Sequence, residues 1–173
     1  MQCCTNRAPT CLQVARAQMA SFFPRLMPEQ AILTHADILI KSWDGNLNSG
    51  KTETAISRLS SAISLIKCLP QSDKKTLLLA NKYSDLAASY FLIQKYLEAD
   101  AFCSLAIGLL KGLPQTQGVN RKLIDTLGNH RIISIGLGDQ RLCLDDAEKM
   151  RRLNFSKILE MDDMVVTRLS LAD

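Results

Sequence analysis

Glycine and proline are scarce in this chain, with 8 Gly and 5 Pro among 173 residues, and long stretches contain neither. Turns between strands depend on these two residues, so their scarcity argues against a turn-rich β fold and favours helices. Hydrophobic residues nevertheless reach 47%, which is enough to build a packed core. No run of about 18 apolar residues occurs, so we expect no membrane span.

A dominant charge of one sign is also missing. The net charge is only +4, and the basic residues stand in short pairs, such as Lys74-Lys75 and Arg151-Arg152, near acidic or apolar neighbours. This pattern is typical of a solvated helix surface rather than of a nucleic-acid-binding face. We therefore expect no nucleic-acid partner.

The six cysteines form neither a disulfide framework nor a metal motif. Cys68, Cys103 and Cys143 fall singly within apolar periodic segments, where a free thiol behaves as a small hydrophobic side chain. There is no C-x-x-C and no Cys/His cluster with zinc spacing, so we expect no metal and no other cofactor. Reduced thiols indicate an intracellular compartment, and we expect the cytoplasm.

Residues 1–27 differ from the rest in composition. They contain several Ser and Thr, three Arg and no acidic residue, the first acid being Glu29. We interpret them as a basic N-terminal arm, partly disordered or with a single amphipathic helix at about Cys11–Phe22. The same composition resembles a mitochondrial transit peptide, so a mitochondrial location is the alternative.

The most informative feature present is an internal repeat. The segment AISLIKCLPQS (Ala62–Ser72) recurs 44 residues later as AIGLLKGLPQT (Ala106–Thr116), with seven of eleven positions identical. Its apolar spacing predicts an amphipathic helix in each copy. Pro70 and Pro114 end these helices, because proline disfavours helical geometry in the residue before it.

A second helix is predicted before each copy. A stripe of apolar residues at alternating spacings of four and three marks it in the second unit, where it includes Tyr83, Leu86 and Tyr90. The corresponding residues of the first unit match at an offset of 47, which places a three-residue surplus within Asp44–Thr52. The repeated unit is therefore a helical hairpin, and we expect units at 28–70 and 74–114, a degenerate third at 119–155, and a closing helix at 156–170.

The hairpin of residues 80–114 resembles the tetratricopeptide repeat. Tyr83-x-x-Leu86-Ala87-x-x-Tyr90 follows the family's W-x-x-L-G-x-x-Y pattern, and Ala99 with a later proline follows its second helix. The resemblance implies an all-α fold in which antiparallel helical hairpins stack as a short right-handed solenoid. The period of 44 residues departs from the family's usual ~34, so its helices or links must be longer.

The stretch GNLNSGKT, residues 45–52, matches the phosphate-binding pattern G-x-x-x-x-G-K-[ST]. As a nucleotide site it would use Gly45, Gly50, Lys51 and Thr52. A phosphate loop follows a buried parallel strand, and Asp37–Trp43 reads poorly as one, whereas Arg131–Asp139 is the most strand-like stretch and ends in an acid that could hold Mg²⁺. We favour a turn between two helices, closed by Gly45 or Asn46 and followed by a Ser49 or Thr52 cap.

No catalytic set emerges from residue spacing. His35 and His130 lie on predicted helices without nearby Cys or paired carboxylates, and the side chains of adjacent acids such as Asp145 and Asp146 diverge on a helix. We therefore expect a non-enzymatic protein.

Stacked hairpins of this family bind peptides or proteins along their first helices, so the resemblance implies a binding groove there. The residues expected to line it are Asn81, Ser84, Ala88, Phe91, Leu92, Asp125 and Ile132. Phe91 and Leu92 could equally serve to pack on the next hairpin. The expected function is that of an interaction module, such as an adaptor, assembly factor or chaperone, for another protein or peptide segment, with self-association through an open end as a further expectation. The alternative is a nucleotide-binding protein.

Overall fold

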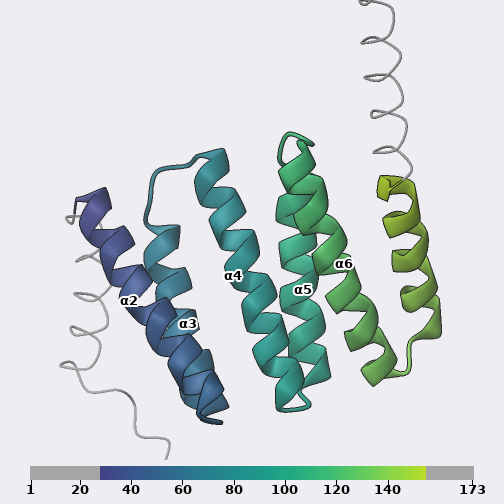
Figure 1. Ribbon diagram of the computed structural model, residues 1–173, viewed down its shortest axis with the longest axis horizontal. Coiled ribbons are helices and arrows are strands. Elements are labelled where there is room, and N and C mark those ends of the chain that lie inside the picture. The colour runs from purple at the N-terminus through teal and green to yellow at the C-terminus, as the bar shows by residue number, and fades with distance from the viewer. Residues whose placement is uncertain (1–27, 155–173) are drawn as a thin grey trace, which may run out of the picture.

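The computed structural model describes residues 28–154, and every regular element in this range is an α-helix. Five helices are α2 (Glu29–Asn48), α3 (Thr52–Lys67), α4 (Asp73–Leu92), α5 (Tyr96–Lys111) and α6 (Gln117–Leu137). A sixth runs from residue 140 to the end of the described range and is called the 140–154 helix. Consecutive helices pack as antiparallel pairs and stand in a row (Figure 1).

These observations confirm an all-α fold of successive helix pairs. Arg131–Asp139, the most strand-like stretch of the sequence, instead forms the end of α6 and the turn after it. The right-handed winding of the row remains a prediction. The expected N-terminal arm, residues 1–27, and the closing helix, residues 156–170, lie outside the described residues.

Corresponding helices of successive units begin 44 residues apart. In the first two units a first helix of 20 residues, a three-residue turn, a second helix of 16 residues and a five-residue link make up one repeat. The third unit keeps the register, since α6 begins 44 residues after α4 and the 140–154 helix begins 44 residues after α5. Even the turn residue with positive φ recurs: Gly50 at 75°, Gln94 at 59° and Gly138 at 76°.

The predicted offset of 47 for the first helices is therefore wrong. No surplus exists in the Asp44–Thr52 segment, because α2 and α4 start and end 44 residues apart. A slip of three residues moves a helical face by only about 60°, so an apolar stripe matches nearly as well one turn out of register. Local periodicity identified the helix but not its alignment.

The residues that cap the first helices also recur from one unit to the next. Ser72 Oγ accepts a hydrogen bond from the Lys75 amide at 3.2 Å at the start of α4. The equivalent Thr116 Oγ1 accepts one from the Val119 amide at 3.3 Å at the start of α6. Such caps satisfy amide groups that have no partner within the helix. Each first helix of the second and third units thus has a defined beginning.

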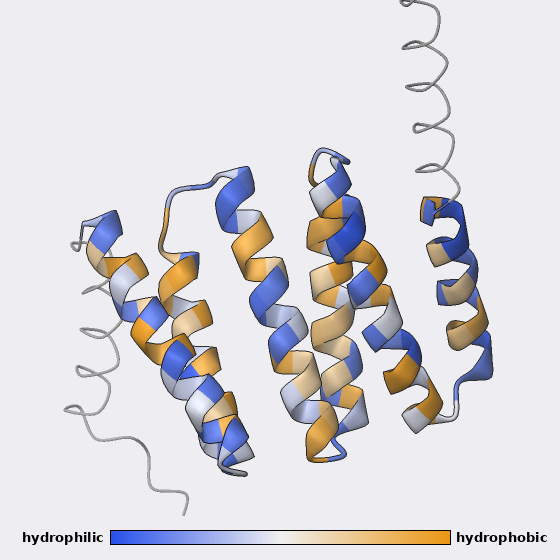
Figure 2. Cartoon of the chain, in the orientation of Figure 1, coloured by the Kyte–Doolittle hydropathy of each residue, from blue (hydrophilic) through white to orange (hydrophobic). Residues whose placement is uncertain are grey.

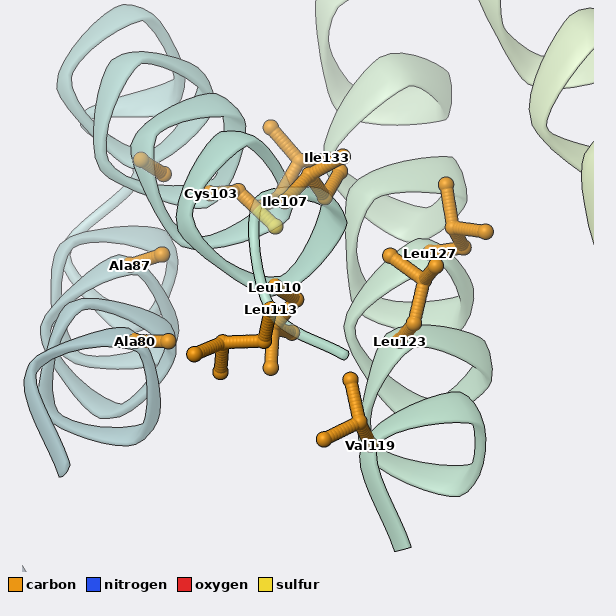
Figure 3. Close-up of a cluster of buried hydrophobic side chains, with 11 residues drawn as sticks. Ala80, Ala87, Cys103, Ile107, Leu110, Leu113, Val119, Leu123, Leu127 and Ile133 are labelled. Carbon is orange, nitrogen blue, oxygen red and sulfur yellow. The ribbon is translucent and has the colours of Figure 1, made fainter. Parts of the chain in front are cut away.

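The core lies between successive helices, which are amphipathic along their length (Figure 2). In the largest apolar cluster, Ile107 and Leu110 of α5 pack with Leu123 and Leu127 of α6 (Figure 3). Small residues allow the backbones to approach closely, and seven alanines of the described range are almost fully buried: Ala36, Ala55, Ala62, Ala80, Ala87, Ala99 and Ala106. Each hairpin is therefore held by its neighbours as well as by its own two helices.

Candidate functional site

Three of the expected groove residues meet in one place. Ala88 and Phe91 of α4, together with Ile132 of α6, line a small cavity of about 100 Å³. Asn129 and Ile133 of α6 complete its walls. The first helices of two neighbouring units thus border a small hollow.

The other expected residues lie around this cavity or away from it. Ser84 Oγ is 3.5 Å from Asn129 Nδ2, so Ser84 contacts the wall without lining the hollow. Asn81, Leu92 and Asp125 do not line it, and Leu92 is exposed. Sequence reasoning missed Asn129 and Ile133, although the helical spacing that places residues three and four apart on one face could have indicated Asn129 from Ile132 and Ile133.

Phe91 has a packing role as well. Its ring lies 5.5 Å from that of Tyr96 at a 56° tilt, and the half-buried side chain packs against the largest apolar cluster. Tyr96 in turn lies against the backbone of α6 at Gly136, where an added Cβ would come within 2.8 Å of the ring. Phe91 therefore holds α4, α5 and α6 together besides lining the cavity.

An exposed apolar strip continues from the cavity along the third unit. It consists of Ile132, Ile135 and Leu144, whose exposed fractions are 53%, 67% and 71%. Ile135 and Leu144 line a second cavity of about 370 Å³, together with Gly138, Gln140 and Cys143. The strip thus connects a hollow between α4 and α6 with another between α6 and the 140–154 helix. Large apolar side chains gathered at concave surfaces commonly mark binding sites.

The phosphate-loop pattern has a helical context. Gly45 to Asn48 form the last turn of α2, and Thr52 begins α3, so only three residues connect the two helices. Asp37–Trp43 is helical, and the described part of the chain offers no strand to precede such a loop. Of the expected features of a nucleotide site, only the charge of Lys51 and the N-terminus of α3 remain.

The turn also differs from its predicted form. Gly50, rather than Gly45 or Asn46, adopts the left-handed conformation. Lys51 occupies the capping position of α3, and neither Ser49 nor Thr52 caps that helix. Ser49 Oγ donates instead to the Gly45 carbonyl at 2.8 Å and so satisfies the end of α2.

A buried histidine network is the feature that sequence reasoning missed. The His130 ring on α6 lies between two carboxylates: Nδ1 is 2.5 Å from Asp146 Oδ2, and Nε2 is 2.8 Å from Asp100 Oδ1. Lys149 Nζ lies 3.1 Å from the other oxygen of Asp146. The expectation that His130 lacks paired carboxylates is therefore wrong, because its partners come from α5 and from the 140–154 helix, 30 and 16 residues away in sequence.

Both ring nitrogens of His130 lie within hydrogen-bond distance of a carboxylate from a neighbouring helix. Ser104 Oγ lies 3.4 Å from His130 Nε2, which gives a superficial likeness to a serine–histidine–aspartate triad. Ionised carboxylates only accept hydrogen bonds, so a carboxylate at each nitrogen is satisfied by an imidazolium that donates from both. In that doubly protonated form the ring has no free lone pair with which to take a proton from Ser104. The geometry is that of an ion-pair network joining three helices.

Cys103 adjoins this network on α5. Its Sγ is 3.5 Å from the Thr126 carbonyl oxygen, to which the thiol donates. Burial, together with the nearby carboxylates of Asp146 and Asp100, raises the pKa of the Cys103 thiol to about 12. A thiol with this pKa is not a nucleophile near neutral pH, so Cys103 is a packing residue.

Neither a metal-binding cluster nor a membrane-spanning helix occurs among residues 28–154. Between residues 28 and 154, no three His, Cys, Asp or Glu side chains converge on a point where a metal ion could sit. None of the described helices is both long enough and apolar enough to cross a bilayer.

Comparison with known proteins adds no assignment. No protein-family model matches the chain, and no curated protein matches it. The likeness to tetratricopeptide repeats consists of the motif residues and the pairing of successive helices, and the chain is not assigned to a family.

Proposed function

We propose that this protein is a non-enzymatic interaction module that binds another protein through the apolar strip of Ile132, Ile135 and Leu144. The observation that carries the proposal is the exposure of these three large side chains, each more than half accessible, along two adjoining cavities. Burying such side chains in a complex releases roughly 1.5–3 kcal/mol for each one that becomes fully covered.

The strip is suited to an amphipathic helix. Ile132 and Ile135 lie three residues apart on α6 and so project from one face, and the two cavities on either side offer places for apolar side chains of a partner. A helix laid in a groove presents such anchors at spacings of three and four residues. The Asn129 amide at the first cavity can fix orientation through a hydrogen bond.

The partner class is therefore a protein or peptide segment with an apolar helical face. The roles of adaptor, assembly factor or chaperone all use such a surface. A cytoplasmic location accords with the proposal.

Selection from a random peptide display library on the wild-type protein provides the test. Affinity of a selected peptide is then compared for wild type, Ile135→Asp and Leu105→Asp. Leu105 is a matched control because it is an exposed branched residue on α5 that lines neither cavity. We expect Ile135→Asp to weaken binding by about tenfold or more and Leu105→Asp to leave it unchanged.

Ile135 is a better probe than Phe91, because Phe91 packs in the core and its replacement would disturb the fold. Helicity by circular dichroism checks that both variants fold. Failure to select any peptide, or equal affinity of wild type and Ile135→Asp, would contradict the proposal.

A further inference from the structure

The outer face of α2 carries an apolar surface with no neighbour among the described residues. Its open cavity of about 560 Å³ is lined by Pro28, Gln30, Ala31, Thr34, His35 and Ile38. Ile38 is 60% exposed. This face lies at the opposite end of the row of helices from the apolar strip (Figure 1).

The repeat register shows what this face does elsewhere in the molecule. Ala31, His35 and Ile38 stand two periods, 88 residues, before Val119, Leu123 and Thr126 of α6. Val119 and Leu123 are buried in one cluster with Ile107 and Leu110 of α5, and the Thr126 carbonyl accepts from Cys103 of the same helix. The equivalent face of α6 is therefore the one that packs on the second helix of the preceding unit.

The same holds one period earlier. Leu79 of α4, 44 residues after His35, packs in a cluster with Ile66 of α3 and Leu69 of the following link. In both later units residues of this face contact the second helix of the unit before it, although the counterpart of Ile38 in α4 is Lys82, whose Nζ lies over the Trp43 ring of α2. The α2 face thus has the geometry of a docking site for a second helix of the same kind.

We propose that residues 8–23 of this chain dock on the outer face of α2 as the second helix of a preceding half-unit. They lie 44 residues before α3 and 88 before α5, and they fall outside the described residues. The positions that α3 and α5 bury carry apolar residues in this segment too. Cys11, Ala15, Met19 and Phe22 stand at the positions of Ala55, Leu59, Ile63 and Ile66 in α3 and of Ala99, Cys103, Ile107 and Leu110 in α5.

The boundaries of the segment fit the same register. Pro9 falls in the first turn, where a helix tolerates proline, and Pro24 follows the last position. Residues 24–28 then match the five-residue links of the later units. Gln18 replaces an alanine at a position that does not face the next unit, since its counterpart Ala106 packs with Tyr83 and Leu86 of its own hairpin.

The link length favours docking within one chain over docking between copies. Five residues connect each second helix to the next first helix in the later units, so a link of the same length brings residues 8–23 to α2 at high effective concentration. Residues 8–23 thereby belong to the helical array, whereas composition alone predicts a basic arm that is partly disordered or contains a single amphipathic helix at about Cys11–Phe22.

Disulfide trapping tests the register directly. Because Cys103 Sγ contacts the backbone of Thr126, the equivalent positions 15 and 38 are expected to be close enough for a disulfide. The double variant Ala15→Cys/Ile38→Cys is made with Cys3, Cys4, Cys11, Cys68 and Cys143 replaced by alanine and buried Cys103 retained. The matched control is Ala17→Cys/Ile38→Cys, because the counterparts of Ala17, Ser61 and Leu105, are exposed.

We expect mild oxidation to give an intramolecular disulfide in the first variant and none in the control. A cross-linked dimer in place of the monomeric product would assign the α2 face to a second copy. Equal cross-linking in both variants would show that residues 8–23 do not hold this register. Either result overturns the proposal.

Hydrogen exchange in α2 provides a second measurement that needs no cross-link. Ala15→Asp places a charge at a position expected to be buried, whereas Ala17→Asp places the same charge outside. We expect exchange in α2 to rise about tenfold or more in Ala15→Asp only, with α5 and α6 unchanged. Equal protection of α2 in the two variants would contradict docking.

Discussion

His130 Nδ1 lies 2.5 Å from Asp146 Oδ2, and this contact ties α6 to the 140–154 helix inside the protein. Asp146 is fully buried, and no other buried carboxylate occurs among residues 28–154. With Asp100 at the opposite ring nitrogen, His130 joins three helices that span two units. The degenerate third unit therefore adds a buried polar network to its apolar packing.

Asp146→Ala should destabilise the protein far more than Asp145→Ala. Removing Asp146 leaves His130 without one of its buried partners, which costs about 3 kcal/mol in the free energy of unfolding. Asp145 carries an exposed pair with Lys149, and its loss should leave the unfolding midpoint nearly unchanged. Urea unfolding of the two variants measures the difference. Similar midpoints for both would show that the network contributes little.

Stability should fall in alkali because of Cys103. Its pKa is about 12 in the folded protein against a reference value of 9.0, so between these values the unfolded chain loses the thiol proton and the folded protein keeps it. The free energy of unfolding then decreases as pH rises, by at most about 1.4 kcal/mol per pH unit from this group. Cys103→Ala should show a shallower decrease above pH 9 in denaturant titrations. Parallel pH profiles would contradict this assignment.

Two glycines of α6 should respond oppositely to alanine. At Gly128 an added Cβ meets only Met150 Cε at 4.0 Å, so the helix propensity of alanine should stabilise the protein by about 0.5–1 kcal/mol. At Gly136 the Cβ would lie 2.8 Å from the packed Tyr96 ring, which has to move and lose its contact with Phe91. Thermal unfolding should show a rise for Gly128→Ala and a fall for Gly136→Ala. A rise for both would show that the Tyr96 ring moves freely.

The hydrogen bond between Trp43 and Ser89 should stabilise the contact between the first two units. Trp43 Nε1 on α2 donates to the fully buried Ser89 Oγ on α4 at 3.1 Å. Ser89→Ala leaves the indole N–H unpaired at a cost of about 1–2 kcal/mol, and it should shift the emission of the chain's single tryptophan. Exposed Ser61→Ala on α3 is the control and should change neither stability nor emission. An unchanged emission maximum in Ser89→Ala would contradict the role of this bond.

The fold was largely predictable because its signals are local. The duplicated segment that contains Pro70 and Pro114 located α3 and α5, and the apolar stripe through Tyr83 and Leu86 located α4. Of the expected groove residues, Ala88, Phe91 and Ile132 do line one cavity. The alignment of the first helices was wrong, because helical periodicity tolerates a slip of one turn.

The buried network could not be found in this way. Asp100, His130 and Asp146 lie on three different helices, and no spacing rule within one helix connects them. Adjacent Asp145 and Asp146 look alike in sequence, yet one is exposed and the other fully buried. Their difference depends on which face of the 140–154 helix meets α6.

By itself, the sequence determined that this chain forms paired helices of nearly constant length, because apolar spacing, prolines and turn residues act within a few positions of one another. Only the tertiary structure decided the common 44-residue register, the partners of His130 and the exposure of Ile132, Ile135 and Leu144. These properties arise from contacts between helices that are distant in sequence, where packing and charge pairing select one arrangement among several that the local pattern allows.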